Sequence, residues 1–536
     1  MKKNIYIILS LAVALLMSCD LDKFPEGDII TDQQKEDVIA GSPEKLAADV
    51  NGLASGLMVY RLFSDVELHF DYGYASVCLH FDAAGQDMVS PSTGYNWFRK
   101  PMLFTDRLYT SEQTEFVWKT YYNHIKAAND ILKVIPSDTE ETLLKYYRGQ
   151  ALASRAFDYL NLIQAYQFTY KGHEDALGVP ILLEEMPIET INNNPRASVS
   201  QVYELILSDL DQSIKLLQGY NRKDKGSIDQ KVAYGLRARA NLLMHNWEAA
   251  ANDAEKAMVG FTPYSKTDVS VPSFNTSTAS SWMWANVITE DNAVVKSGIL
   301  NWPSHLCSFT GNGYTTATGT FRKINKLLWD QIPSSDVRKG WWIDEKLSSP
   351  LTDDIYLTDD KGNDIPASEG FGWEPYTNVK FHAYQSIPGN GTNASDWPIM
   401  RVEEMILIKA EAQAMAGNLS GAKATLEDFV KGYRDPEFKS KASSPEELRD
   451  EVWFQRRLEL WGEGFSLFDI LRLKKPIIRV ENGQSNYPAD ARFNIEAEAP
   501  ILLYLVPEAE ISVNDGIGIG DNNESATPPS PVRADK

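Results

Sequence analysis

Cysteine is scarce in this sequence, with three residues among 536, at positions 19, 78 and 307. A disulfide framework needs several paired cysteines, and a structural zinc site needs closely spaced Cys or His ligands, so both are excluded. Cys78 and Cys307 are most simply free, buried thiols, although the sequence alone leaves a bond between them open. The chain must therefore rely on a hydrophobic core, for which its 43% hydrophobic residues suffice.

Positive charge is also in deficit. The chain has 52 Lys and Arg residues against 74 Asp and Glu residues, a formal net charge of −22, and its pI is near 4.8. Nucleic-acid binding draws most of its affinity from Lys and Arg residues that neutralise phosphates. We therefore expect no nucleic-acid partner, and a neutral or cationic ligand fits the charge balance better.

The usual catalytic motifs are missing as well. The sequence contains no Gly-x-Ser-x-Gly, no His-Glu-x-x-His and no phosphate-binding Gly-Lys-Ser/Thr, and its seven histidines are scattered between His69 and His382. We predict a protein that is not an enzyme, with no catalytic residue, no metal site and no cofactor. A glycoside hydrolase stays open as an alternative, because it needs only two suitably spaced carboxylates among the 74 acidic residues.

The N-terminus has the parts of a bacterial secretion signal. Two lysines precede an apolar run over residues 5–16, which is too short to span a bilayer. The run ends in the sequence LMSC at residues 16–19, which resembles the lipobox of bacterial lipoproteins, in which the cysteine is acylated. We predict a signal peptide over residues 1–18, lipidation of Cys19 and a tether over residues 19–41. The alternative is a plain signal peptide that happens to contain a cysteine.

Helical periodicity covers much of the remaining chain, and two segments repeat one another. Residues 228–258 and 400–433 each read as a helix, a turn and a second helix. When Asn246 is aligned with Asn418, small residues coincide, namely Ala238 with Ala410, Ala240 with Ala412 and Ala250 with Ala422. Such crossings are typical of tetratricopeptide pairs, units of about 34 residues that stack on their neighbours. With the earlier helical stretches, the sequence predicts a mainly α fold of about four pairs.

A loop-rich insertion separates the two repeated segments. Residues 260–399 are rich in Ser, Thr, Asn and Gly and hold eight of the thirteen tryptophans, which are Trp282, Trp284, Trp302, Trp329, Trp341, Trp342, Trp373 and Trp397. Because so many indoles are hard to bury in a loop-rich region, we expect some of them to be exposed. The chain then divides into a helical-repeat region over 42–259, this ligand-binding insertion, a C-terminal region over 400–515 and a disordered tail over 516–536.

Segment 455–475 reads QRRLELWGEGFSLFDILRLKK, and its apolar residues recur at helical spacing, which predicts one buried helical face. Charged residues on the other side are spaced to pair across one turn, Arg456 with Glu459 and Asp469 with Arg472. Gly462 and Gly464 do not fit this helix, because a glycine inside a helix costs about 1 kcal/mol relative to alanine.

The same segment resembles the C-terminal signature of the SusD/RagB family of nutrient-binding outer-membrane lipoproteins, with an Arg-Arg-x-Glu-Leu run, a Gly-Glu-Gly and an aromatic-Asp-hydrophobic-hydrophobic-Arg in order. Further pieces occur in the family's order, namely the lipoprotein start, RAFDYLNLIQAY, the Gly178-Val179-Pro180 loop, VYELILSDLDQSI, RVEEMILIKAEA and LVPEAEI. The tail after Asn514 departs from the family's short ending. Gln455 also departs from it, because the family usually has Glu there, which puts one ion pair in doubt.

The resemblance implies a fold and a role. SusD-like proteins consist of tetratricopeptide-type helix pairs with a loop-rich ligand-binding region. They cover SusC-like TonB-dependent transporters and capture oligosaccharides, or peptides in some relatives. The resemblance therefore implies a lipid-anchored protein of the outer membrane that faces the cell exterior, with a SusC-like transporter and an oligosaccharide as partners.

Aromatic residues beside polar ones are the candidates for glycan contacts. An aromatic ring covers the apolar face of a sugar while a polar neighbour holds the hydroxyl groups. Local composition selects Tyr95, Asn96, Trp97, Trp282, Trp284 and Trp302. The alternative for each of these tryptophans is that it packs in the core, because aromatic residues are mostly buried. Other tryptophans are assigned to packing, namely Trp118, Trp247, Trp341, Trp342, Trp453 and Trp461.

We expect this protein to capture a glycan at the cell surface and pass it to a transporter. Peptide capture of the RagB type and a surface glycoside hydrolase are the alternatives. A tetratricopeptide adaptor that binds only protein is a third, but it leaves the Trp-rich insertion hard to explain.

Overall fold

The structure is a computed structural model that describes residues 42–63 and 66–532. The predicted signal peptide, Cys19 and the tether up to residue 41 lie outside the described residues. The chain divides into residues 1–45 and residues 46–536. The described part of the first unit is residues 42–45, which enter a 3-10 turn at Pro43–Leu46. The α-helices and strands belong to the second unit.

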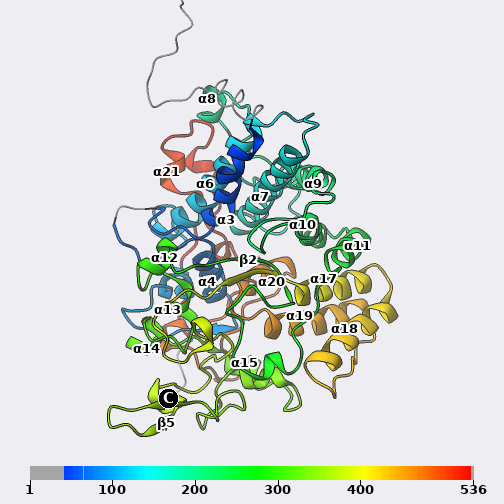
Figure 1. Cartoon of the computed structure of the whole chain (residues 1–536). Coiled ribbons are helices and arrows are strands. Elements are labelled where there is room, and N and C mark those ends of the chain that lie inside the picture. The colour runs from blue at the N-terminus through cyan, green and yellow to red at the C-terminus, as the bar shows by residue number, and fades with distance from the viewer. Residues whose placement is uncertain (1–41, 64–65, 533–536) are drawn as a thin grey trace, which may run out of the picture. The chain divides into compact units, whose positions relative to one another are not determined.

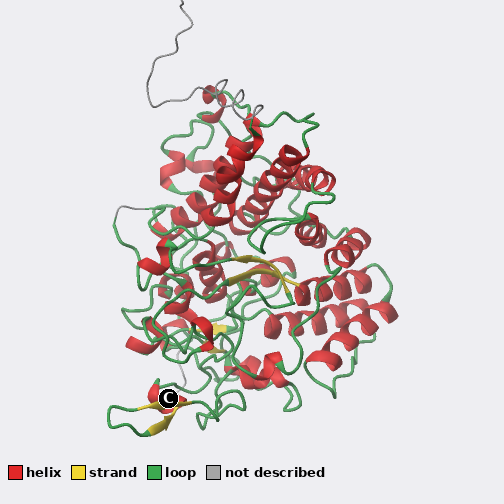
Figure 2. Cartoon of the chain, in the orientation of Figure 1, coloured by secondary structure: helices red, strands yellow, loops and turns green. Residues whose placement is uncertain are grey.

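Helices dominate the secondary structure of this unit (Figures 1 and 2). The longer helices are α3 (Ala47–Gly56), α4 (Tyr74–Ala84), α6 (Glu112–Val134), α7 (Thr142–Tyr166), α9 (Val199–Leu216), α10 (Gln230–Leu243), α11 (Trp247–Ala257), α17 (Val402–Met415), α18 (Leu419–Tyr433), α19 (Pro445–Glu459) and α20 (Ser466–Arg472). The short helices are α5 (Arg99–Leu103), α8 (Ile188–Ile191), α12 (Ala293–Lys296), α13 (Trp302–Leu306), α14 (Tyr314–Thr318), α15 (Lys326–Trp329), α16 (Ala367–Gly370) and α21 (Glu508–Ile511). Within residues 42–63 and 66–532, none has the length and apolarity that a bilayer crossing requires.

The helices pack as four successive pairs, α3 with α6, α7 with α9, α10 with α11 and α17 with α18. Neighbouring pairs also touch, since α6 lies against α7, α9 against α10 and α11 against α17. The last of these contacts joins helices on either side of the insertion. The predicted mainly α fold is confirmed, and its four pairs are consistent with tetratricopeptide-like stacking.

The two repeated segments have the same local design. The aligned turn residues His245 and Gly417 both adopt left-handed backbone conformations, with φ of +62° and +89°. The aligned alanines are fully buried, namely Ala238, Ala240, Ala250, Ala410, Ala412 and Ala422. Small buried residues let the helices of each pair approach closely, as the repeat in the sequence predicts.

Segment 455–475 does not form the single helix that its periodicity suggests. Helix α19 ends at Glu459 and α20 begins at Ser466, and Gly462 and Gly464 between them have φ of +82° and +92°. A Cβ atom on Gly464 would also lie 2.7 Å from Cβ of Cys78. The two glycines are there because the turn needs a left-handed backbone in close contact with α4.

The charges of this segment are buried rather than solvated, and one predicted pair is wrong. Asp469 pairs with Arg472 at 2.7 Å as expected, but Arg456 pairs with Asp469 at 2.8 Å instead of with Glu459. Glu459 accepts two bonds of 2.8 Å from Arg434. The spacing rule for helix surfaces fails for Arg456 and Glu459 because the turn at Gly462 brings Asp469 of α20 to Arg456, while Glu459 meets Arg434 from the end of α18.

Gln455, the departure from the family pattern, belongs to the same buried network. Its side-chain oxygen accepts a hydrogen bond from Arg338, which also pairs with Asp336 at 2.6 Å. The neutral amide of Gln455 therefore forms a hydrogen bond to Arg338 where a glutamate would form an ion pair.

The insertion is built from loops tied by short antiparallel strands. Strand β2 (Trp282–Asn286) pairs with β6 (Trp397–Arg401), β1 (Met88–Val89) with β3 (Lys323–Ile324), and β4 (Tyr356–Thr358) with β5 (Asp364–Pro366). Seven of its eight tryptophans are buried, which are Trp282, Trp284, Trp302, Trp341, Trp342, Trp373 and Trp397. The expectation that some of these indoles are exposed is therefore wrong for these seven, and Trp329 is half-buried.

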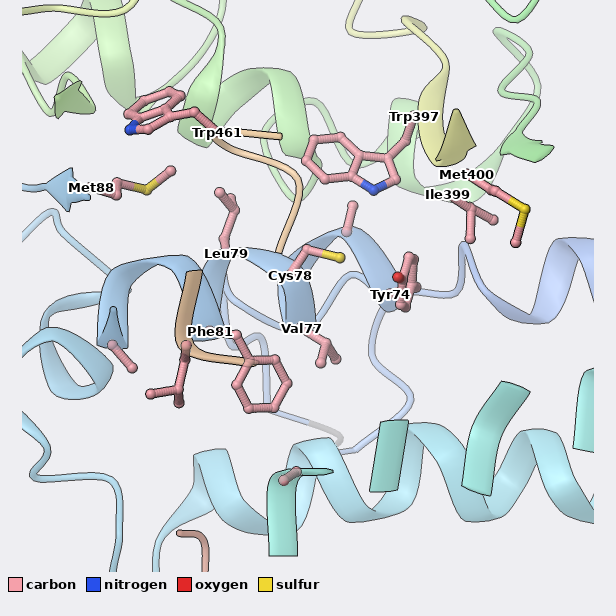
Figure 3. Packing of buried hydrophobic residues seen from close by; sticks show 14 of the residues in the cluster. Tyr74, Val77, Cys78, Leu79, Phe81, Met88, Trp397, Ile399, Met400 and Trp461 are labelled. Atoms are coloured by element: carbon pink, nitrogen blue, oxygen red, sulfur yellow. The ribbon is translucent and has the colours of Figure 1, made fainter. Parts of the chain in front are cut away.

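Helix α4 lies at the centre of the core and is buried along its whole length. Figure 3 shows Trp397 and Trp461 on one side of it, with Cys78 and Leu79 pointing toward them. Cys78 and Cys307 are both free and buried, as expected for small apolar residues.

The predicted disordered tail is wrong for residues 516–523. Ile517 is buried, and Asn522 exchanges hydrogen bonds of 2.8 and 2.9 Å with the backbone of Val506. Asn523 donates to the carbonyl oxygen of Tyr166 at 2.7 Å, at the end of α7. The polar composition that suggested disorder instead supplies side-chain bonds to backbone groups.

Candidate functional site

Four aromatic side chains gather where three loops meet, one of them from the insertion. Tyr95 and Trp97 come from the loop after β1, His69 precedes α4, and Tyr314 begins α14. Tyr95 is 59% exposed, and the other three are half-buried. We call Tyr95, Trp97, His69 and Tyr314 the aromatic cluster.

The loop that carries Tyr95 and Trp97 is fixed from below by Asn96. Its side-chain oxygen accepts hydrogen bonds from the backbone N–H of Phe98 at 3.1 Å and from Arg322 at 2.7 Å. Its amide donates to the carbonyl oxygen of Pro91 at 2.9 Å. Burial lowers the pKa of Arg322 to about 10, so this guanidinium stays charged at neutral pH. Asn96 therefore holds the loop and does not face a ligand.

The rings of the cluster rest on aromatic residues of the core. His305 stacks on Tyr72 with ring centroids 5.4 Å apart, and Tyr314 stacks on His305 with centroids 4.9 Å apart. Tyr95 lies 6.5 Å from Tyr314. Aromatic contacts thus run from buried Tyr72 to exposed Tyr95, and they fix the outer rings in place.

His69 connects the two halves of the cluster. Its ring stacks on Trp97 with centroids 4.7 Å apart and planes 7° apart, and Nδ1 is hydrogen-bonded to the Tyr314 hydroxyl. Its carbonyl oxygen accepts from Nε2 of His305 at 2.9 Å, which assigns the proton of His305 to Nε2.

Both histidines are held in the neutral form. Burial lowers the pKa of His69, although the negative charge of Glu67 acts to raise it. Burial and the Arg322 charge lower the pKa of His305 well below its ordinary value. Burial raises the pKa of Tyr314, so its hydroxyl group stays protonated. The cluster is therefore an uncharged surface of rings with hydroxyl and imidazole groups at neutral pH.

The structure brings together two of the six predicted contact residues. Tyr95 and Trp97 belong to the cluster, but Asn96 is buried beneath it. Trp282, Trp284 and Trp302 are 0%, 2% and 1% exposed, so their assignment to glycan contact is wrong. Trp284 and Trp302 instead donate to the carbonyl oxygens of Gly226 at 3.0 Å and Ser395 at 2.8 Å.

Two members of the cluster were missed from the sequence. His69 and Tyr314 are 245 residues apart. Tyr314 lies in GNGYTT without another aromatic residue beside it, whereas His69 lies in LHFDYGY, which has the aromatic and polar composition of a candidate group. No local pattern indicates that the two residues meet.

In the part of the chain that the structure describes, neither a metal-ion cluster nor the cavity beside α4 offers an alternative site. Among the described residues, no group of three or more His, Cys, Asp and Glu side chains is arranged to hold a metal ion. The cavity between α4, α17 and α20, lined by Cys78 and Arg456, measures about 50 Å³. That volume is enough for water and far below that of a sugar ring's site.

The structure is that of a mainly helical protein with packed helix pairs and a cluster of aromatic rings at its surface. Comparison with known proteins gives the family. The model of the SusD family matches residues 314–518. A second model, described as "Starch-binding associating with outer membrane", matches residues 81–242. The chain belongs to the SusD/RagB family, as its signature segment suggests.

Individual relatives support the same placement. The SusD-like protein P38 of Formosa agariphila is 23% identical over 417 residues, which cover 70% of this chain and 75% of that protein. A SusD-like carbohydrate binding protein of Bacteroides vulgatus has a similar fold, with a TM-score of 0.72 and 24% identity over 90% of this chain and 98% of that one. A SusD superfamily protein of Bacteroides thetaiotaomicron has a TM-score of 0.70 at 20% identity, over 90% and 99% of the two chains.

Proposed function

We propose that this protein captures an oligosaccharide on the aromatic cluster. The observation that carries the proposal is the ring surface formed by Tyr95, Trp97, His69 and Tyr314. Aromatic faces cover the C–H face of a sugar ring, and the adjoining hydroxyl and imidazole groups can exchange hydrogen bonds with its hydroxyl groups.

The preformed state of the cluster supports a binding role. Tyr314 and Trp97 are already held by His69 and His305, so little side-chain freedom remains to be lost when a ligand binds. Because the cluster is uncharged, a neutral ligand meets no desolvated charge there. The cluster itself contributes no carboxylate, whereas a glycoside hydrolase acts through a pair of them.

Family membership extends the proposal beyond the site. The matched model that mentions starch and the outer membrane, and the carbohydrate-binding description of the Bacteroides vulgatus protein, favour a sugar over a peptide. We further propose a lipid anchor at Cys19, a position on the outer face of the outer membrane, and delivery of the captured oligosaccharide to a SusC-like TonB-dependent transporter. An alanine at Cys19 should release the protein from membranes.

Isothermal titration of residues 20–536 against plant, host and microbial oligosaccharides tests the proposal. Each mixture is afterwards analysed for products. Saturable binding with intact sugar supports capture and names the substrate class. Shortened products support a glycoside hydrolase instead. Binding of peptides without binding of any sugar supports the RagB-like alternative.

A further inference from the structure

A second groove lies away from the aromatic cluster and shares no residue with it. It measures about 560 Å³, and its lining includes Trp329, Trp342, Ser334, Ser349 and Asp353. Sites for small molecules usually occupy about 300–1,000 Å³, so the groove has the size of a binding site.

The only half-buried tryptophan of the insertion lines this groove. Trp329 ends α15, and Tyr376 packs edge-on against its ring at 5.4 Å. Lys339 lies over the ring at 4.5 Å and donates to the carbonyl oxygen of Ile332 at 2.7 Å. Seven other tryptophans of the insertion are packed into the core, so the partial exposure of this one is a local feature of the groove.

Two indole N–H groups of the groove have no acceptor among the described residues. They are the N–H groups at Nε1 of Trp329 and of Trp342, and both nitrogen atoms are buried. The whole side chain of Trp342 is 1% exposed. Trp284 and Trp302, by contrast, donate to backbone carbonyls, and so does Trp341 to Val269 at 3.0 Å. The indole N–H groups of Trp282 and Trp397, outside the groove, are likewise buried without an acceptor. The binding role of the groove is therefore argued from its size and from the half-buried ring of Trp329.

The carboxylates of the groove are already bonded to other groups of the protein. Asp353 accepts from the Ser348 hydroxyl at 2.9 Å and from the Ser349 N–H at 3.0 Å. Asp344 accepts from the Ser348 N–H at 3.0 Å. Asp336 pairs with Arg338 at 2.6 Å. The carboxylates of the groove are thus bonded within the fold. What remains is the Trp329 ring, serine hydroxyl groups and the ammonium groups of Lys266 and Lys339, which can all contact a ligand rich in hydroxyl groups.

The groove also continues into a neighbouring hollow. A space of about 650 Å³ lies between α19 and the segment after α18. Its lining has two aromatic residues, Phe438 and Phe454, and otherwise mostly charged residues of both signs, such as Glu437 and Lys439. Both spaces include Ser335 and Asp336 in their lining, so they meet at this point. Each space has the volume of a small-molecule site, so the two together can take more than one sugar ring.

We propose that the groove of Trp329 and Trp342 is a second carbohydrate-binding site, which takes a segment of a neutral oligosaccharide. The site is separate from the aromatic cluster, so that one glycan chain or two can be held at two places on the protein. Ser334 and Ser335 lie at the edge of the groove, where their hydroxyl groups can meet those of the sugar.

Titration of maltoheptaose, cellohexaose, xylohexaose, mannohexaose and laminarihexaose into matched variants tests this site. The starting variant is Tyr95→Ala/Trp97→Ala, which lacks the exposed rings of the cluster. Trp329→Ala and, separately, Ser334→Arg are added to it. Ser334 is exposed, so its substitution fills the groove without removing a core residue. Tyr356→Ala, on exposed strand β4, is the control, and thermal unfolding checks that each variant is folded.

We expect the cluster-deficient protein to keep binding at least one of these sugars, and each groove substitution to weaken that binding at least tenfold while Tyr356→Ala leaves it unchanged. Loss of all binding in the cluster-deficient protein, or residual binding that neither groove substitution changes, overturns the second site. Absence of binding to all five sugars in the unmutated protein overturns it as well. If only the groove substitutions reduce binding, the second site stands and the role of the aromatic cluster is wrong.

Discussion

The ring of Trp97 lies flat on the ring of His69, with the two planes 7° apart and the centroids separated by 4.7 Å. One face of the indole is thus supported by the protein, and the residue is only half-buried. An indole held in this way is a rigid surface for a second flat partner.

Replacement of Trp97 by alanine should therefore weaken oligosaccharide binding about tenfold or more, equivalent to ~1.4 kcal/mol. The melting temperature should hardly change, because Trp97 lies at the edge of the core. Titration calorimetry and thermal unfolding of the same samples measure both quantities. Tyr356→Ala serves as the control for an exposed aromatic residue outside the site. Unchanged affinity in Trp97→Ala would remove this residue from the site.

Replacement of Trp284 by alanine should lower stability and leave the affinity for oligosaccharide unchanged. Its indole is buried, meets Phe157 edge-on at 4.9 Å and donates to Gly226. We expect the free energy of unfolding to fall by about 3–5 kcal/mol, as for other large buried residues, with unchanged affinity in the folded fraction. Urea unfolding measures the effect against Ile519→Ala, which truncates an exposed side chain. A stable Trp284→Ala protein with lost binding would contradict the burial-based assignment.

Stability in acid should depend on Glu459. Burial alone would raise the pKa of this carboxyl group, but the charges of Arg434, Arg401 and Arg338 outweigh burial and hold the pKa well below its ordinary value of 4.5. The stabilising contribution is therefore complete above about pH 4.5 and is lost as the pH falls toward the folded-state pKa, by about 1.4 kcal/mol per pH unit.

Glu459→Gln should lower the free energy of unfolding by about 3–5 kcal/mol at pH 7, because it leaves buried arginines without their partner. The difference from the unmutated protein should narrow below pH 4.5. Urea unfolding at pH 7, 4.5 and 3.5 gives the comparison, with Glu248→Gln on the exposed side of α11 as a control. A difference that stays constant with pH would show that the effect comes from packing and not from the charge.

Gly464 should not tolerate alanine. Its φ of +92° strains any other residue, and the added Cβ would lie 2.7 Å from Cβ of Cys78. We expect a loss of about 2 kcal/mol or more from strain and overpacking together. Gly432, inside α18, has open space around it, so Gly432→Ala should instead stabilise the protein by about 0.4–1 kcal/mol. Equal melting temperatures of the two variants would refute the assignment.

The sequence predicts the helix pairs well because their signals are local. Ala238 and Ala410 stand at helical spacing from their apolar neighbours, and Asn246 and Asn418 mark the turns. The family signature adds the order of the pieces. The buried ion pairs around Glu459 could not be predicted in the same way, since Arg434 and Arg401 reach it from different segments.

The candidate site was predicted in part for the same reason. Tyr95 and Trp97 stand together in the sequence, whereas His69 and Tyr314 join them only through the tertiary fold. The composition of the insertion was misleading about its tryptophans. Trp302, for example, is buried and donates its N–H to a carbonyl oxygen 93 residues away, a contact that no local pattern predicts.

Asn523 bonds to Tyr166 across a separation of 357 residues, and this contact has a kinetic consequence. The carbonyl oxygen of Tyr166, at the end of α7, lacks this hydrogen-bond donor until residue 523 has been synthesised and has packed against α7. Loop closure over so many residues is an entropic cost that must be met before the contact contributes. We therefore expect the first helix pairs to form early in a loosened state, and to reach their final hydrogen-exchange protection only when the last segment docks.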